Sequence, residues 1–428
     1  MSLTLPAPTA PTAHTPLYGT DAPLCDPKHW ALDPTLTFLN HGSYGACLHE
    51  VLAAQTAIRT RTERDPVRFY KVEMEGIFDE VRRSLGQFCN CPANCIAPAM
   101  NATVALATIF YNYFINHPVK PGDEILVTDH EYSSGVNELT RLAAQYGFRV
   151  VTAKIPFPIN SPEQVTEAVL AAITPRTRLA LISHVTTTTS LVFPIQTIVD
   201  EFNRRGIDVV VDGAHAPGQV EVDIAALNPT YYVGSLHKWF SSPKGTGFAY
   251  VRPDHQTNFR TLALSSRADK VRPDRPLFLR DFDYMGTADY SSLMAIPATF
   301  AAMNGLIPGG WPAIRAHNHA LVLKARQIVC DATGLTPPAP ASMVASMASL
   351  ILPPAPAHLA SRRTIYDDPL QDILVDRHRL QVPIWPWNKH PTLRIMRISA
   401  QVYNFANQFH TLATALNAEL SSEQPAIR

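Results

Sequence analysis

The sequence has little charge of either sign. Asp, Glu, Lys and Arg make up 17% of the 428 residues, whereas about 25% is usual, and 36 basic residues balance 36 acidic ones. A chain without excess positive charge has no electrostatic basis for holding a nucleic-acid backbone or an anionic membrane. Because 46% of the residues are apolar, we expect part of the surface to be buried between subunits. The composition therefore predicts an oligomer with no nucleic-acid partner.

Cysteine and long apolar runs are also scarce. Six cysteines are too few for a disulfide scaffold, and the group Cys89, Cys91 and Cys95 has no second Cys or His pair at zinc-site spacing. No stretch approaches the roughly 20 apolar residues that span a bilayer. The first 27 residues contain no Lys or Arg, unlike a signal peptide. We predict a cytoplasmic protein with no membrane partner and no bound metal.

From residue 97 to 251 short β-rich runs alternate with amphipathic helical patterns, which is typical of repeated strand-helix-strand units. Helical patterns cover 134–146, 161–173 and 194–205. The pattern predicts an α/β fold with a mostly parallel, doubly wound sheet. The strand-like runs are 124–128, 149–155, 178–184, 208–212, 231–235 and 247–251.

The pattern of helical and strand-like segments changes after residue 290. A long helical pattern over 311–332, shorter strand-like pieces, an exposed loop over 353–368 and a last helix over 403–420 predict a smaller α+β domain. We expect four parts of the chain: a flexible arm (1–28), a segment contributing to the small domain and the cleft (29–96), a large α/β domain (97–290) and a small C-terminal α+β domain (291–428).

Two strand ends carry reactive side chains. Asp212 ends the run that begins at Asp208, and Lys238 follows the run Tyr231–Ser235. Taken alone, Asp212 fits a turn or helix cap and Lys238 a surface lysine. Ligands of doubly wound sheets bind beyond the carboxyl ends of the strands, so the two side chains are expected to meet there. An amine that forms a Schiff base and a carboxylate that keeps a pyridine nitrogen protonated are what a pyridoxal phosphate site needs.

Further motifs extend this pattern. With them the sequence resembles the class V branch of the fold type I pyridoxal phosphate enzymes, which includes cysteine desulfurases and isopenicillin N epimerase. The resemblance runs from about Phe38 to Leu420 and is closest to the epimerase-like subgroup. It implies the fold type I architecture and pyridoxal 5'-phosphate as the cofactor. The motifs that carry it are Phe38-Leu-Asn40-His41-Gly42-Ser-Tyr-Gly, Asp65-Pro-Val-Arg-Phe69, Thr128-Asp-His-Glu-Tyr132 and Gln381-Val-Pro383-Ile.

The resemblance implies roles for the residues around the cofactor. Lys238 corresponds to the Schiff-base lysine, Asp212 to the partner of the pyridine nitrogen and His215 to the contact near the phenolic oxygen. Tyr132 falls where the family places a ring over the pyridine, which suits a flat cofactor. Thr187 stands where relatives often have Asn, so its role stays open. Phosphate contacts are implied for Ala102, Thr103, Ser235 and His237, and for Thr287 reaching the phosphate of the neighbouring subunit.

The resemblance also implies an amino-acid-type substrate and a homodimer with shared active sites. Arg397 corresponds to the arginine that holds an amino-acid carboxylate, a task that suits a planar guanidinium. A structural salt bridge is the alternative for this residue. Asn40 and His41 are expected to line the substrate entrance.

The reaction itself stays open at this stage. Epimerisation or racemisation through a carbanion at the α-carbon is the first reading, with a carbon-sulfur β-elimination lyase or a biosynthetic cyclase or aminotransferase as alternatives. An inactive cofactor-binding structural or regulatory protein is the alternative of another class. A desulfurase that forms a persulfide is disfavoured, because the last cysteine, Cys330, lies 67 positions before Arg397.

Overall fold

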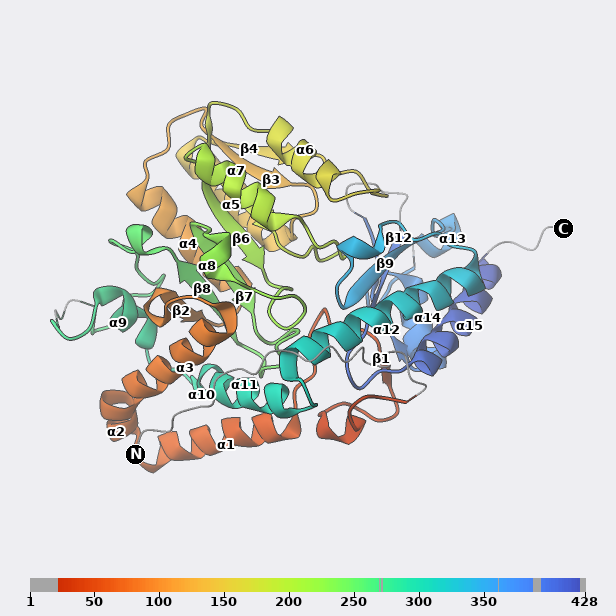
Figure 1. Cartoon of the computed structure of the whole chain (residues 1–428), viewed down its shortest axis with the longest axis horizontal. Helices are drawn as coiled ribbons and strands as arrows, with labels where there is room; N and C mark the ends of the chain where they lie inside the picture. The colour runs from red at the N-terminus through yellow and green to blue at the C-terminus, as the bar shows by residue number, and fades with distance from the viewer. Residues whose placement is uncertain (1–21, 269, 271, 361, 388–393, 424–428) are drawn as a thin grey trace.

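The computed structural model describes residues 22–268, 270, 272–360, 362–387 and 394–423. Figure 1 shows a large sheet with helices on both faces and, beside it, a smaller group of blue strands and helices from the C-terminal part of the chain. Residues 1–21 of the predicted arm lie outside the described part. The four predicted boundaries stay predictions.

The large sheet has seven strands in the order β2-β8-β7-β6-β5-β3-β4. Strands β4, β3, β5, β6 and β7 run parallel, and β8 and β2 are antiparallel to their neighbours. This confirms the mostly parallel sheet. The bounds are β2 (Ile96–Ala99), β3 (Glu124–Thr128), β4 (Arg149–Ala153), β5 (Thr177–Ser183), β6 (Asp208–Gly213), β7 (Tyr231–Ser235) and β8 (Gly247–Val251).

Strand β6 shows why the strands of the large sheet appear in the sequence as continuous apolar runs. Val209 and Val211 pack into the hydrophobic core on one face of the sheet, and Val210 packs into the core on the other. Helices cover both faces, so β6 is buried from Val209 onward and shows no polar alternation. Burying each valine contributes about 1.5–3 kcal/mol and anchors the strand that carries Asp212 near its end.

Helices cover both faces of this sheet. α4 (Ala102–Asn116) and α5 (Ser133–Tyr146) share a core with one face. The other face packs against α3 (Met74–Cys89), α6 (Glu163–Ala171), α7 (Ile195–Arg204) and α8 (Ile224–Leu227). The three helices predicted in this region are present, each within two residues of its predicted ends.

The smaller group contains a three-stranded antiparallel sheet in the order β11-β12-β9, from β11 (Ile384–Pro386), β12 (Arg394–Ser399) and β9 (Met347–Leu352). It packs against α12 (Gly310–Thr333), α14 (Pro369–His378) and α15 (Ala406–Glu423). Strand β1 (Thr37–Phe38) pairs in parallel with β10 (Leu380–Gln381), so the N-terminal segment reaches this group. The remaining helices are α1 (His49–Arg64), α2 (Pro66–Arg68), α9 (Leu277–Asp283), α10 (Ser291–Met294), α11 (Ile296–Gly305) and α13 (Ala357–Ala360).

Two predicted elements differ from the structure. The last helix begins at Ala406 and not at Tyr403, because the Asn404 side chain accepts a hydrogen bond from the Gln401 N–H at 3.0 Å and closes a turn there. The loop predicted as exposed over 353–368 ends on a buried residue, since Asp368 pairs with Arg394 at 2.7 Å. A local side-chain turn decides the first case, and an ion pair between distant residues decides the second.

Across the described residues, no single helix has the length and apolar character needed to cross a membrane. The pair formed by residues Ser291–Gly305 and Gly310–Thr333 meets the criterion in length and composition alone, with a bend of 67° between its two halves.

Candidate active site

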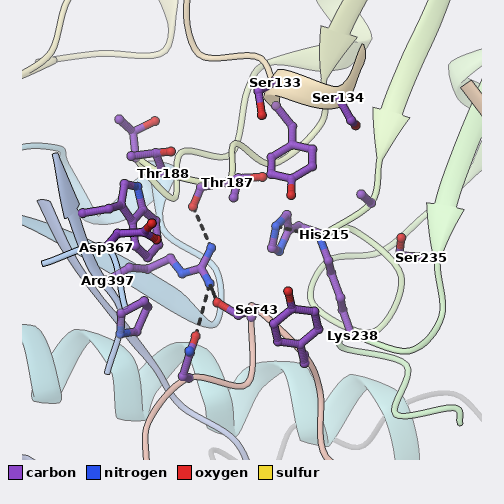
Figure 2. A pocket seen from close by; sticks show the side chains of 18 of the residues that line it. Ser43, Ser133, Ser134, Thr187, Thr188, His215, Ser235, Lys238, Asp367 and Arg397 are labelled. Carbon is purple, nitrogen blue, oxygen red and sulfur yellow. Dashed lines mark hydrogen bonds between the residues drawn. The ribbon is translucent and has the colours of Figure 1, made fainter. Parts of the chain in front are cut away.

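A cleft of about 910 Å³ opens at the carboxyl ends of the parallel strands. Its wall combines the residues that follow β3, β5, β6 and β7 with residues of β11 and β12 and of the N-terminal segment. Figure 2 shows Arg397 on one side of this space and His215 and Lys238 on the other. The cleft therefore lies where the sheet topology predicts a ligand. The predicted site residues that line it are Asn40, Ala102, Thr103, Tyr132, Thr187, Asp212, His215, Ser235, His237, Lys238 and Arg397.

Lys238 projects into the cleft just beyond β7. Burial lowers the pKa of its amine to about 8, with Asp212 acting in the opposite direction and Arg397 in the same one. The neutral amine, which is the nucleophilic form, is consequently far more populated near physiological pH than in a free lysine. The position and the protonation state both suit covalent attachment of an aldehyde.

His215 contacts this amine directly. Its Nε2 lies 3.1 Å from the Lys238 Nζ, and the Trp239 indole N–H donates to its Nδ1 at 3.4 Å. Burial and the neighbouring Lys238 hold the pKa of His215 well below its usual range, so the ring is neutral. A neutral imidazole can exchange a hydrogen bond with the lysine amine.

Asp212 is the next-to-last residue of β6 and is buried, with 5% of its surface exposed. Its Oδ1 accepts the Ala214 N–H at 2.9 Å. Burial raises the pKa of this carboxyl, while the Ala214 hydrogen bond and the charge of Lys238 act to lower it. A carboxylate held in this way at a strand end can pair with a protonated nitrogen in the cleft.

The start of α4 forms a cradle of donors. The Asn101 side chain caps the helix by accepting the Val104 N–H at 2.9 Å, and the first two helical N–H groups, of Ala102 and Thr103, have no partner within the helix. The Ala102 N–H instead donates to the Ser235 Oγ at 3.3 Å. Thr103 and Ser134 contribute hydroxyl groups 3.2 Å apart. Backbone N–H groups at a helix start together with hydroxyls suit a phosphate.

The residues present therefore fit pyridoxal phosphate. The cleft offers an amine, a carboxylate, a phosphate cradle and the half-exposed ring of Tyr132, at the start of α5, as a stacking surface. His237 also lines the cleft, with its Nδ1 3.0 Å from the Thr246 carbonyl oxygen. These groups differ in chemical kind, and each suits a different part of the cofactor.

Arg397 is a buried cation without a carboxylate partner among the described residues. Its guanidinium donates to the Thr187 carbonyl oxygen and the Ser43 Oγ, both at 2.8 Å, and to the Asn40 Oδ1 at 3.4 Å. Its Nε has no hydrogen-bond partner in the described part of the chain, and burial lowers its pKa to about 9. The structural salt bridge considered for Arg397 is absent from the described residues. An uncompensated buried charge of this kind is stabilised by an anionic ligand.

The structure does not bring two predicted site residues to the cleft wall. His41 has no exposed surface and lies behind Lys238, with its ring 2.9 Å from the Tyr403 hydroxyl and 3.1 Å from the Lys238 carbonyl oxygen. It therefore does not line the entrance as predicted. Thr287 is exposed, lies outside the cleft of its own chain and bonds to the Tyr284 hydroxyl at 2.7 Å.

Sequence reasoning missed several residues of the site. Ser43 bonds to Arg397, and the Trp385 ring centroid lies 5.2 Å from the Arg397 Cζ. Gly42 gives space to this arginine, because a Cβ at Gly42 would lie 3.2 Å from its guanidinium. Glu131 is buried in the cleft wall, and burial raises its pKa to about 7. The motif around Asn40 and the one ending at Tyr132 contain Ser43 and Glu131, but Trp385 carries no comparable signal.

One group of side chains in the described residues has metal-ligand spacing, namely His117, Asp208 and His255. The Arg252 guanidinium lies 3.1 Å from the His255 Nε2, which disfavours a cation there. The cysteines of the predicted cluster remain thiols, since burial raises the pKa of Cys89, Cys91 and Cys95.

The chain is similar to known proteins over most of its length. The model of the family described as aminotransferase class-V matches residues 51–357. Isopenicillin N epimerase of Amycolatopsis lactamdurans is 32% identical over 403 residues, which cover 91% of this chain and 96% of that protein. The probable L-cysteine desulfhydrase, chloroplastic, of Arabidopsis thaliana is 28% identical over 401 residues, which cover 90% and 83%.

Among solved structures, the cystine C-S lyase C-DES in complex with its product cysteine persulfide has a TM-score of 0.74 and 18% identity, covering 92% of this chain and 99% of that one. A variant of the same lyase, with a TM-score of 0.72 and 18% identity over 91% and 97% of the two chains, carries glycine covalently linked to its PLP cofactor. These likenesses establish a shared fold.

Proposed function

Because the chain belongs to the class-V aminotransferase family and is a pyridoxal phosphate-dependent enzyme, we propose that it inverts the configuration at the α-carbon of an amino acid or amino-acid-containing metabolite. The resemblance and the fold type I architecture expected from the sequence are confirmed. The observation that carries the proposal is the buried Arg397, which has no carboxylate partner among the described residues and faces Lys238 across one cleft.

Different residues of the chain serve the cofactor and the reacting carbon in the proposed reaction. Lys238, Asp212 and Tyr132 line the cleft. Lys238 would bind the cofactor aldehyde and move a proton at the α-carbon, Asp212 would keep the pyridine nitrogen protonated, and Tyr132 would cover the ring. Ala102, Thr103, Ser235 and His237 hold the phosphate. When bound, pyridoxal phosphate supplies an electron sink that stabilises negative charge at the α-carbon.

Arg397 orients the substrate through its carboxylate. A guanidinium donates two parallel N–H bonds to a carboxylate, and the bond is strong where water is excluded. Thr187 and Ser43 fix the plane of the guanidinium before the substrate arrives. The carboxylate also restores charge balance to a cation that burial destabilises.

The lining of the cleft supports a substrate larger than a free small amino acid. The cofactor occupies part of the cleft of about 910 Å³, so the lining residues, and not the volume, indicate the kind of substrate. Trp385, Trp387 and Tyr366 line it in addition to the groups described above and offer a broad aromatic surface for an extension of the amino acid. This favours the epimerase-like reading over a lyase for cysteine.

A β-elimination lyase is the second candidate, favoured by the desulfhydrase relative and the likeness to C-DES. A reaction that forms a persulfide on the enzyme has no support, since no cysteine belongs to the cleft lining within the described residues and Cys330 is buried elsewhere in the core.

The first prediction separates these two reactions. The holoenzyme is incubated in heavy water with isopenicillin N or with L-cysteine, and the α-proton signal, the epimer, pyruvate and sulfide are measured by NMR and chromatography. We expect loss of the α-proton signal of isopenicillin N and formation of its epimer. Release of pyruvate, ammonia and sulfide from cysteine, without any epimer from isopenicillin N, would instead establish the lyase.

The second prediction concerns assembly. We propose a homodimer in which Thr287 reaches the phosphate of the partner's site, which agrees with its exposed position away from its own cleft. Loss of one hydrogen bond to a charged group costs about 1.5–3 kcal/mol, so Thr287→Ala is expected to weaken cofactor binding by about tenfold or more. Sedimentation should give two chains per particle. An active monomer, or unchanged cofactor affinity in the variant, would contradict this arrangement.

A further inference from the structure

Inversion at a carbon needs a proton donor on each face of it, and Lys238 serves only one face. We propose that the phenol of Tyr132 is the acid and base on the face opposite Lys238. This inference rests on the epimerase-like function proposed above, and it gives Tyr132 a chemical role beyond covering the cofactor ring.

The sheet topology brings the two groups to the cleft from opposite sides. Lys238 follows β7 and Tyr132 follows β3, and the strand order places β6 and β5 between them. Asp212, which anchors the pyridine nitrogen in the proposed function, lies next to the end of β6. A flat group held above Asp212 therefore has the lysine approaching from one side and the tyrosine from the other.

The distances agree with this arrangement. The Lys238 Nζ lies 5.8 Å from the centroid of the Tyr132 ring, and both side chains line the cleft. Proton transfer to carbon requires a heavy-atom contact of about 2.6–3.2 Å on each face. The amine and the tyrosine ring are therefore near enough to border the same reacting carbon.

Arg397 lines the same cleft as Lys238 and Tyr132. Its charge acts to lower the pKa of Tyr132, and the tyrosine in turn acts to raise the pKa of Arg397, so the two lie within electrostatic reach of each other. With the substrate carboxylate on Arg397 and the substrate nitrogen near Lys238, the α-carbon lies between these groups and beside Tyr132. None of the other arginines of the described residues lines the cleft.

The protonation states suit the assignment. Burial, together with Tyr44 and Asp212, raises the pKa of Tyr132, so its phenol carries a proton at neutral pH and can donate it. The charge of Arg397 stabilises the phenolate that remains after donation.

One turnover needs no further reactant to supply or remove protons. The Lys238 amine takes the α-proton as the C–H bond breaks, and the Tyr132 O–H bond breaks as its proton forms a new C–H bond on the opposite face. A proton then passes from the lysine ammonium through cleft water to the phenolate. The reverse reaction uses the same groups in exchanged roles.

The test compares Tyr132→Phe with Tyr111→Phe, a control because Tyr111 is 46% exposed on α4 and is not among the residues that line the cleft. Isopenicillin N and its epimer are incubated separately with each holoenzyme in heavy water. In Tyr132→Phe we expect deuterium exchange of one epimer to stay within a few fold of the unmodified enzyme. Exchange of the other epimer and interconversion should fall by about 10²-fold or more. Tyr111→Phe should preserve both.

Cofactor binding supplies a readout that does not depend on turnover. The phenylalanine keeps the aromatic ring, so the dissociation constant of pyridoxal phosphate and the visible spectrum of Tyr132→Phe should match those of the unmodified protein. Interconversion at the normal rate, equal loss of exchange for both epimers, or weakened cofactor binding in Tyr132→Phe would each overturn the inference. An unmodified enzyme that exchanges protons without forming the epimer would instead reject the epimerase-like function, and the role of Tyr132 with it.

Discussion

Replacing Lys238 with alanine is expected to give a folded protein that holds pyridoxal phosphate without a covalent bond and has almost no activity. The side chain projects into the cleft, where its amine has a pKa lowered to about 8 and contacts His215. Loss of acid-base catalysis alone costs about 10²–10⁴-fold in rate, and loss of covalent attachment adds to this. Borohydride reduction followed by mass spectrometry of the intact protein measures the covalent cofactor directly.

Two variants serve as controls for this experiment. Lys244 lies six residues further along and donates to the Gly45 carbonyl oxygen, so Lys244→Ala should keep the covalent cofactor. Asp212→Ala should also keep it, yet lose most turnover, because an unprotonated pyridine is a poor electron sink. Covalent cofactor in Lys238→Ala, whether at another lysine or not, would show that Lys238 has been assigned wrongly.

The part of the site built on the parallel strands could be predicted from the sequence. β6 and β7 are short apolar runs with both faces buried, and their ends are marked by Asp212 and Lys238. Since parallel strands end at the same edge of a sheet, order along the chain is enough to bring these side chains together. The cap residue Asn101 likewise marks the start of α4 and hence the phosphate cradle.

The parts that depend on distant contacts could not be predicted in the same way. His41 contacts Tyr403, 362 positions away, and this contact places its ring behind Lys238 instead of at the entrance. Trp385 approaches Arg397 only because β11 pairs with β12. Pairing between strands of a separate sheet leaves no periodic signal that would identify which side chains meet across the cleft.

Arg394 and Arg397 illustrate the same limit within one strand. Both lie on β12 and both are buried, but an odd spacing in a strand directs them to opposite faces. Arg394 pairs with Asp368 at 2.7 Å and with Glu423 at 2.8 Å. Arg397 has no such partner in the described residues and faces the cleft. The sequence alone marks both as candidate carboxylate ligands.

This contrast defines the last prediction. Arg397→Ala is expected to weaken binding of the amino-acid substrate by about 30-fold to several thousandfold, because truncating one partner of a buried charge pair costs about 2–5 kcal/mol. Arg397→Lys should recover only part, since an ammonium lacks the planar fork. Titration of the cofactor's visible band with isopenicillin N measures the affinity, and retention of the cofactor itself should change little.

Replacing the two arginines should have different effects on the free energy of unfolding, and this difference separates a ligand-binding role from a structural one. Burial lowers the pKa of Arg397 to about 9, so at neutral pH the folded protein keeps a charge that its surroundings disfavour, and Arg397→Met should leave the free energy of unfolding unchanged or raise it. Arg394→Met leaves Asp368 and Glu423 as buried unpaired carboxylates and should lower that free energy by about 3–5 kcal/mol, with substrate affinity unchanged among folded molecules. Chemical denaturation of the two variants, with and without isopenicillin N, compares them directly. If Arg397→Met unfolded as readily as Arg394→Met and kept its affinity for substrate, Arg397 would be a structural residue and the carboxylate would bind elsewhere in the cleft.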